Sequence, residues 1–247
     1  MLSEERLKRI KELEKRSFER GIFTFSDFMS PTSLSEATAL LKRGEYSVYG
    51  GVSFAERAMI RFGNEEDLGY EEEFPLCVLR ITLQGGKFAV PITHRDVLGA
   101  VLNLGIERQK LGDIFVNRDF AYVITDKTVS KLILEELKSV GRNKVLVEEA
   151  DGVPDSFAPK CESKEFSVAS NRADAIICKA YNLAREDGSS LFVKGLVTVN
   201  GRPCESPSRA LKAGDVVTVR GFGKFAFIEE GGLSKKSKLY VSISVYV

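Results

Sequence analysis

One continuous stretch, residues 171–221, constrains the fold of this chain more than any other. Its first part carries apolar residues at the helical spacing i, i+3, i+4 and i+7, namely Ala173, Ile176, Ile177 and Ala180. This spacing predicts a helix with one buried stripe. A second helix is predicted from about Arg185, with Ala184, Leu191 and Phe192 facing inward, and it ends at Gly195 because glycine suits the left-handed conformation after a helix.

After these two helices, the pattern changes to that of a small β-sheet. Residues 197–199 are typical of a strand, and Asn200-Gly201 is a strong signal for a two-residue hairpin turn. A second strand is predicted at 216–219, directly after Gly214-Asp215. The stretch is therefore expected to form a compact unit of two helices packed on a small sheet.

The polar residues of this unit fall outside the apolar stripe. Arg172 and Lys179 lie one heptad apart, while Arg185 and Ser189 share the outer face of the second helix. Asp174 is interpreted as a first-turn acid that stabilises the helix and positions Arg172 or Arg185. The residues predicted to bind nucleic acid, which the resemblance described below identifies as RNA, are Arg172, Lys179, Arg185, Ser189, Lys194, Arg202, Arg209, Arg220 and Lys224. For each one alone, a solvated surface charge is an equal alternative.

The charge distribution agrees with this interpretation. Residues 166–247 contain 12 Lys and Arg against 7 Asp and Glu, a net charge of +5, whereas residues 1–165 contain 24 against 28, a net charge of −4. Because nucleic-acid phosphates attract a localised positive surface, the C-terminal part is the candidate RNA-binding part.

Composition argues against several other classes of protein. The chain has 247 residues, enough for more than one domain, with 43% hydrophobic and 29% charged residues. Four cysteines without CxxC spacing and a single histidine predict no metal site, and no cofactor is expected. No apolar run is long enough to span a membrane, and the charged N-terminus does not resemble a signal peptide, so a cytoplasmic location is predicted.

The N-terminal region, residues 1–74, is predicted to be rich in helix. Charge pairs at helical spacing indicate a helix over 3–20 that ends at Gly21. Two capping-box patterns, Ser33 with Glu36 and Ser53 with Glu56, predict the starts of two more helices, the first of which ends at Gly44. A strand is expected at 46–49, and the acidic run 65–73 is interpreted as a solvated loop.

The central region, residues 75–150, shows a βαββαβ pattern, which predicts a ferredoxin-like domain in an α+β protein. The predicted elements are strand 76–83, a short return at 88–90, helix 94–105, strands 113–116 and 120–125, helix 126–141 and strand 144–149. Residues 151–165, which contain two prolines, are predicted to be a linker to the C-terminal domain, 166–247.

Two features of the central region allow a functional or a structural interpretation. Phe120 and Tyr122 share a face of one strand, where an RNA-recognition motif would place stacking aromatics, but core packing is favoured because the basic and glycine residues of that motif are absent. His94, Arg95, Asp96 and Arg108 form a second candidate set. His94-Arg95-Asp96 resembles a kinase catalytic loop, but Val101 stands where that loop needs asparagine. We therefore interpret His94 and Asp96 as residues that cap a helix, with Arg95 pairing with Asp113 or Glu107, although a contact with RNA remains an alternative.

The C-terminal stretch resembles the RNA-binding domain named for small-subunit ribosomal protein four, here called the S-four domain. The matching residues are Arg172-x-Asp174, Ala184-Arg185, Lys194-Gly195-x-Val197-x-Val199-Asn200-Gly201 and Gly214-Asp215-x-Val217-x-Val219. Ala173 and Gly188 depart from the usual Leu and Ala. Because glycine costs about 1 kcal/mol inside a helix, the second helix is expected to be frayed or short.

The chain as a whole resembles the YlmH family of bacterial S-four proteins. The residues that carry this resemblance are Phe23-Thr24, Pro31, Gly50-Gly51 with Ala55-Glu56-Arg57, the segment from His94 to Ile114, Arg220-Gly221-x-Gly223-Lys224-Phe225 and Ser234-Lys235-Lys236. The resemblance implies a monomeric, ribosome-associated protein without established catalytic activity, which rescues stalled large ribosomal subunits by contacting ribosomal RNA and transfer RNA. An RNA-modifying enzyme with an appended S-four domain and a protein adaptor anchored to RNA are the alternatives.

Overall fold

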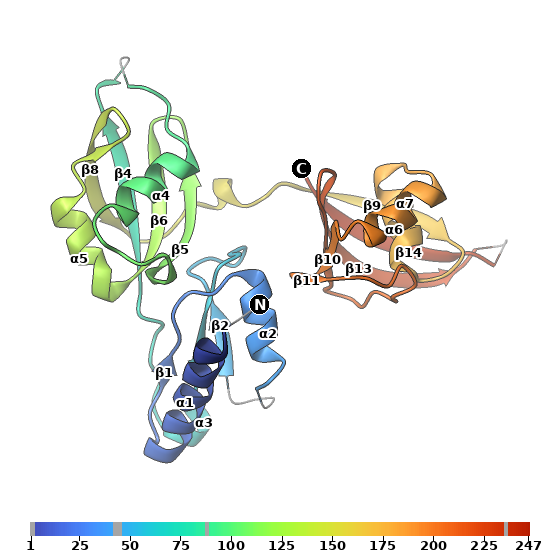
Figure 1. Ribbon diagram of the computed structural model, residues 1–247, viewed down its shortest axis with the longest axis horizontal. Coiled ribbons are helices and arrows are strands. Elements are labelled where there is room, and N and C mark those ends of the chain that lie inside the picture. Colours follow the sequence, from blue (N-terminus) through green and yellow to red (C-terminus); the bar gives the residue numbers. More distant parts are fainter. Residues whose placement is uncertain (1–2, 42–45, 87–88, 235–236) are drawn as a thin grey trace. The chain divides into compact units, whose positions relative to one another are not determined.

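The computed structural model describes residues 3–41, 46–86, 89–234 and 237–247 (Figure 1). Helices and antiparallel sheets occur together, so the expected mixed α and β composition is confirmed. The chain divides into two compact units, Met1–Ala158 and Pro159–Val247. The break between the two units lies inside the predicted linker 151–165, whereas the predicted boundary at 74/75 lies within the first unit, and the domain limits stay a prediction. Strand β9 (Cys161–Val168) begins inside that linker and pairs along its length with β14 (Leu239–Tyr246). The polar, exposed sequence of β9 is that of an edge strand, which sequence patterns do not separate from a loop.

The first part of the N-terminal unit contains a small three-stranded sheet, in the order β1-β3-β2, and three helices. Its elements are α1 (Glu4–Arg20), β1 (Thr24–Phe25), α2 (Pro31–Thr38), β2 (Tyr46–Tyr49), β3 (Met59–Phe62) and α3 (Glu65–Leu68). The predictions of α1 and β2 are confirmed. Ile10 and Leu13 of α1 are buried in a core with Ile60 and Phe62 of β3.

Two N-terminal predictions are wrong. Helix α2 starts at Pro31, two residues before Ser33, because the hydroxyl of the N-cap residue Ser30 accepts the Ser33 N–H and Pro31 occupies the first turn. It ends at Thr38, while the predicted end at Gly44 lies outside the described residues. Residues 53–58 are not helical. The acidic run 65–73 is also not entirely loop, since it begins with the short helix α3.

The loop at 50–57 instead turns back on itself and is held by the central sheet. A Cβ at Gly50 would lie 2.3 Å from the Arg57 carbonyl oxygen, so only glycine fits there. The Asp113 carboxylate accepts the backbone N–H groups of Glu56 (2.6 Å) and Arg57 (3.2 Å). The N–H groups of Glu56 and Arg57 are therefore bound by a carboxylate that is distant in the sequence, and the predicted helix cap at Ser53 does not form.

The central part of the same unit is a five-stranded antiparallel sheet with the order β5-β6-β4-β8-β7. Its elements are β4 (Leu76–Gln84), α4 (His94–Leu102), the 3-10 helix Arg108–Lys110, β5 (Leu111–Val116), β6 (Phe120–Asp126), α5 (Lys127–Glu136), β7 (Ser139–Val140) and β8 (Asn143–Ala150). Helix α5 is five residues shorter than predicted at its C-terminal end, where β7 follows. Of the predicted return strand 88–90, Phe88 is outside the described residues, and Ala89 and Val90 are not in a strand.

The two faces of this sheet have different coverings. Helices α4 and α5 cover one face, where Val97, Val101 and Ile133 pack against Leu79 and Ile81 of β4. The other face carries Ile124, which packs with Phe28 and Met59 from the N-terminal part. The N-terminal part therefore completes the core of the central sheet.

Arg57 fastens the N-terminal part to the central sheet through its guanidinium. Nε donates to the Leu111 carbonyl (2.9 Å), and Nη2 donates to the carbonyls of Phe28 (3.2 Å) and Arg108 (3.3 Å). Burial, together with the nearby charge of Arg108, lowers the pKa of Arg57 to about 10. This half-buried guanidinium donates to three carbonyls and so links three chain segments.

The C-terminal unit consists of two helices packed on a six-stranded sheet with the order β11-β10-β12-β13-β14-β9 (Figure 1). Its remaining elements are α6 (Ala173–Tyr181), α7 (Arg185–Val193), β10 (Val197–Val199), β11 (Arg202–Pro203), β12 (Val216–Val219) and β13 (Gly223–Leu233). The predicted stripe of α6 is buried, as are Leu191 and Phe192 of α7. Ala184, however, is an exposed N-cap residue, so its predicted inward position is wrong.

The Asn200-Gly201 hairpin turn is also confirmed. Both residues have positive φ, 51° and 74°, as a tight hairpin of this kind requires. The Asn200 side chain donates to Asp215 Oδ1 (2.7 Å) and accepts the Val216 N–H (2.8 Å). The turn residue thus also links β10 to the start of β12.

Candidate RNA-binding surface

Arg172 precedes α6 and forms a two-point ion pair with Asp174. Nε and Nη2 donate to the two carboxylate oxygens at 3.0 and 2.7 Å. The Asp174 side chain is 5% exposed and also accepts the Ala175 N–H, whereas the Arg172 side chain is 39% exposed. The buried carboxylate therefore orients a guanidinium that reaches solvent, as the sequence interpretation of Asp174 anticipated.

The pKa values of Asp174 and Arg172 are shifted in opposite directions, as expected for an ion pair. Burial alone would raise the pKa of Asp174, but the hydrogen bonds from Arg172 and Ala175 and the charges of Arg172 and Arg185 hold it below its usual value. The hydrogen bond to Asp174 raises the pKa of Arg172. Since the charge of Arg185 acts on Asp174, the starts of α6 and α7 lie near each other.

The backbone of Arg209 lies next to the start of α6, because its carbonyl accepts the Ala173 N–H (2.9 Å). We call Arg172, Asp174, Arg185 and Arg209 the helix-start cluster. Arg185 and Arg209 are exposed. The charges of Arg172 and Arg185 therefore act on one buried carboxylate, and the backbone of Arg209 adjoins the same helix start.

A second group lies at the turn between β12 and β13. The Arg220 N–H donates to the Leu196 carbonyl (2.9 Å), which places Arg220 near Lys194 at the end of α7. Lys224 follows on β13, with its ammonium 4.5 Å from the centroid of the Tyr246 ring. We call Lys194, Arg220 and Lys224 the turn cluster.

The other three predicted residues are not joined to these clusters by the contacts described. Lys179 is exposed in the last turn of α6, and Ser189 is partly buried on α7. Arg202 is partly buried on β11, at the edge of the sheet opposite β9. RNA binding by each of the nine residues stays a prediction.

The His94-Arg95-Asp96 segment forms the start of α4. Asp96 and Thr93 make a reciprocal capping box, in which Thr93 N–H donates to Asp96 Oδ2 (2.8 Å). These hydrogen bonds lower the pKa of Asp96. The predicted capping role of Asp96 is confirmed, with Thr93 rather than His94 as its counterpart.

The two carboxylates predicted to pair with Arg95 accept hydrogen bonds from other groups. Asp113 binds the loop at 56–57, and Glu107 accepts from Gln109. Arg108 donates to the carbonyls of Leu111 (2.6 Å) and Gly112 (3.1 Å) at the start of β5. Asp96 and Arg108 thus have structural partners, while a role of this segment in RNA binding stays a prediction.

The aromatic residues of the central sheet are covered from within the same unit. Phe157, in the 3-10 helix Asp155–Phe157, makes edge contacts with Phe115, Phe120 and Tyr122 at centroid distances of 6.0, 6.1 and 5.6 Å. Tyr122 is only 7% exposed. The packing interpretation of Phe120 and Tyr122 therefore describes this structure.

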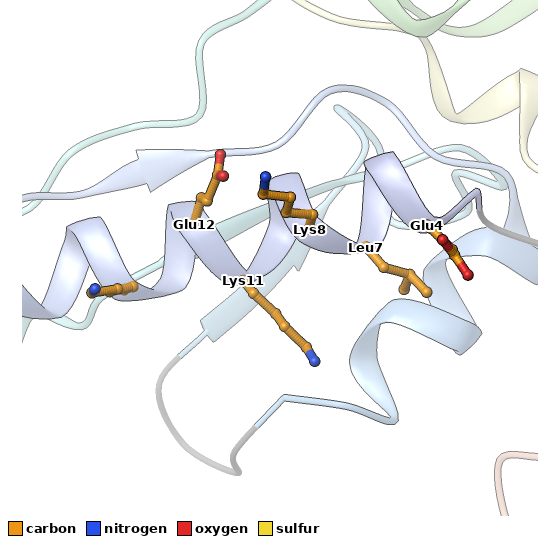
Figure 2. Close-up of a pocket in the computed structure, with 6 residues that line it drawn as sticks. Glu4, Leu7, Lys8, Lys11 and Glu12 are labelled. Carbon is orange, nitrogen blue, oxygen red and sulfur yellow. The ribbon is translucent and has the colours of Figure 1, made fainter.

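Among the described residues of the N-terminal unit, a depression and a cavity were considered as sites. Figure 2 shows a depression of about 410 Å³ on the surface of α1. Its lining side chains do not converge on one point, since Lys8 and Glu12 extend to one side of the helix and Lys11 to the other. A cavity of about 210 Å³ contains Asp27, Lys110 and Asp126 in its lining. Lys110 bridges the two carboxylates at 2.7 and 2.9 Å, so the polar groups of this cavity satisfy one another.

Searches of the described residues for two other kinds of site gave no candidate. Among residues 3–41, 46–86, 89–234 and 237–247, no group of three or more His, Cys, Asp or Glu could hold a metal ion. Within the same residues, no helix combines the length and the apolar character needed to cross a membrane.

Comparison with known proteins gave three similarities. A relative from Bacillus subtilis (strain 168), named "Ribosome-associated protein quality control protein P2", is 28% identical over 223 residues, 88% of this chain and 85% of the relative. The solved structure "Cell division protein ylmH from Streptococcus pneumoniae" has a similar fold, with a TM-score of 0.50 at 20% identity, covering 64% of this chain and 96% of that chain. Residues 70–152, which include the whole central sheet, match the family described as "Putative RNA-binding domain in YlmH".

Proposed function

We propose that this chain is a non-enzymatic RNA-binding factor that acts on the ribosome. The observation that carries the proposal is the similarity, along 88% of the chain, to a relative whose name states that it is ribosome-associated. The match of residues 70–152 to an RNA-binding family supports it independently. Its proposed ligand is ribosomal RNA or transfer RNA on the large subunit, and the protein acts as a cytoplasmic monomer.

The proposal includes a fold assignment for each part. We assign residues 76–150 to the ferredoxin-like class, which the antiparallel order β5-β6-β4-β8 and the helices on one face support. We assign the C-terminal unit to the S-four class. Two helices on a small sheet, with the Asn200-Gly201 hairpin and the Arg172 and Asp174 pair, support that assignment.

The helix-start cluster is the proposed contact with the RNA backbone. A guanidinium has five N–H donors, and the Asp174 pair uses Nε and Nη2 of Arg172. The pair fixes the plane of the group, so less side-chain entropy is lost when phosphate binds. Folded RNA presents phosphates and 2′-hydroxyls on its surface, and a compact basic domain recognises these groups and the shape of the helix.

The test is co-sedimentation of the full chain with large ribosomal subunits after charge reversal. Arg185→Glu with Arg209→Glu, at the two exposed arginines of the helix-start cluster, is preferred to reversal at Arg172, because a carboxylate in place of the partner of the buried Asp174 would destabilise the fold. The double variant is expected to lose most of its binding. The control is Lys160→Glu with Lys164→Glu, an equal change of net charge on exposed residues of the same unit. Unchanged binding of the first variant would overturn the assignment of the surface.

A further inference from the structure

The turn between β12 and β13 carries an aromatic residue between two basic residues in the sequence Arg220-Gly221-Phe222-Gly223-Lys224. The sequence patterns predict Arg220 and Lys224 as site residues, but not Phe222. The Phe222 side chain is 46% exposed. Gly221 and Gly223 have φ of 89° and 134°, conformations in which other residues are strained, so the turn has a specific geometry.

Phe222 is connected to the core by a series of aromatic rings. Its ring lies 5.8 Å from that of Tyr181, which lies 6.1 Å from that of Phe225. Phe225 is fully buried, so the series runs from the core of the C-terminal unit to its surface. The Phe222 ring is therefore exposed but is held in place by the rings packed beneath it. Binding of a ligand to it costs little conformational entropy.

The Tyr181 hydroxyl adds a second observation. Burial raises the pKa of Tyr181 to about 12, and within the part of the chain that the structure describes its oxygen has no hydrogen-bond partner. A buried hydroxyl without a partner is costly, and such groups often mark sites that a ligand completes. This hydroxyl lies 3.4 Å from the position of a Cβ at Gly223, beside the same turn.

The charges around the ring indicate what kind of ligand it binds. Arg220, two residues before Phe222, is exposed, and Lys224, two residues after it, has its ammonium 4.5 Å from the centroid of the Tyr246 ring. Cations that flank an exposed aromatic ring suit a nucleotide, because the phosphates meet the cations while the base stacks on the ring. A base inside an RNA duplex is already stacked on its neighbours, so the ligand must be an unpaired nucleotide.

We propose that Phe222 is a stacking residue for an unpaired base next to the RNA helix that the turn cluster contacts. This inference rests on the proposed function and specifies its ligand: folded RNA in which a single-stranded nucleotide adjoins a duplex. Stacking on phenylalanine accepts any base, so the site recognises the junction rather than a sequence. Lys194 and Arg220 bind the backbone on the duplex side.

The experiment compares two RNA hairpins that differ only in a short single-stranded overhang, which carries the fluorescent base 2-aminopurine. The full chain is titrated as wild type, Phe222→Leu and Phe222→Trp. The leucine variant keeps an apolar side chain without a ring, and the tryptophan variant keeps the stacking surface. Phe222→Leu is expected to weaken binding of the overhang hairpin about 5- to 100-fold and to abolish quenching of 2-aminopurine. Phe222→Trp is expected to retain both.

Three further results distinguish this inference from the proposed function. Binding of the blunt hairpin by Phe222→Leu should equal that of the wild type, with an unchanged slope of log affinity against log salt, because stacking releases no counterions. Equal weakening for both hairpins, or for neither, would overturn the stacking role while RNA binding stands. A wild-type protein that binds neither hairpin would overturn the proposed function and this inference together.

Discussion

Gly188 of α7 leaves room for the side chain of Cys178 on α6. A Cβ placed at Gly188 would lie 2.2 Å from the Cys178 sulfur, far inside van der Waals contact. Gly188 is buried, and α7 runs through it as a continuous helix of nine residues. The expected fraying of this helix is therefore not observed, because the glycine allows close packing of two helices in return for its lower helix propensity.

The first prediction concerns this pair. Gly188→Ala is expected to destabilise the C-terminal unit by about 1–3 kcal/mol, the usual cost of overpacking. Cys178→Ala should remove the clash, so the double variant is expected to recover most of that loss and to gain from the better helix former at 188. Urea unfolding, with hydrogen exchange of α6 and α7 amides, measures the free-energy changes.

A matched control for this prediction is Gly99→Ala in α4. No atom lies within 4 Å of a Cβ placed there, so this change should stabilise its helix by about 0.5–1 kcal/mol. If Gly188→Ala behaves like Gly99→Ala, the two helices can separate without cost and the packing argument is wrong.

The second prediction concerns Lys110, which bridges Asp27 and Asp126. Burial opposes its charge, but hydrogen bonds to the two carboxylates raise the pKa of Lys110. Burial likewise opposes ionisation of Asp126, but hydrogen bonds from Thr128 and Lys110 hold its pKa below the usual value. Lys110→Met leaves Asp126, with an 8% exposed side chain, without this cation. The expected loss at pH 7 is about 1–3 kcal/mol, less than for a fully buried pair because Lys110 is partly exposed.

The pH dependence of that loss follows from the directions of the two shifts. A carboxylate with a lowered pKa contributes stability above its unfolded value, about 3.9, and loses it as pH falls through the folded value. The difference between wild type and Lys110→Met should therefore shrink in acid, and again above about pH 10.4 as the lysine loses its charge. Thermal unfolding across pH measures it, with Lys131→Met of the exposed pair Lys131 and Glu135 as control. A difference that stays constant from pH 7 to pH 3 would contradict the role of Asp126.

The third prediction concerns Phe157, which covers Phe115, Phe120 and Tyr122. Phe157→Ala removes three aromatic contacts and should cost about 1–3 kcal/mol, since the ring is only partly buried. Amides of β5 and β6 should exchange faster, and the chain near residues 151–160 should become sensitive to protease. Phe18→Ala is the control, because that ring is 85% exposed and its removal should change stability by less than about 0.5 kcal/mol. Unaltered exchange in β5 and β6 would show that Phe157 does not protect the sheet.

Sequence patterns were sufficient where an element depends on its own residues. The stripe of α6, the end of α1 at Gly21 and the Asn200-Gly201 turn are local features, and the structure contains all three. The prediction failed at Ser53 because Asp113, more than fifty positions away, binds the N–H groups that a local cap would have used. Strand β9 was missed for a similar reason, since only pairing with β14 makes it a strand.

The candidate site likewise combines a local relationship, which the sequence predicts, with contacts across the fold, which it does not. Arg172 and Asp174 are two residues apart at a helix start, so their relationship could be inferred from their closeness in the sequence. Grouping Arg209 with Arg172, or Arg220 with Lys194, requires contacts across the fold that no periodicity contains. The aromatic series from Phe225 to Phe222 likewise depends on Tyr181 from a different element.

The packing of Ile124 against Phe28 and Met59 has a practical consequence for anyone who wishes to isolate the segment that matches the family. A fragment cut at the limits of the family match, residues 70–152, would lack both of these partners and also Phe157. One face of its sheet would then be an uncovered apolar surface, which favours self-association in solution. Fragment experiments should therefore retain residues 3–158, so that failure to bind reflects the chemistry of the protein rather than a damaged fold.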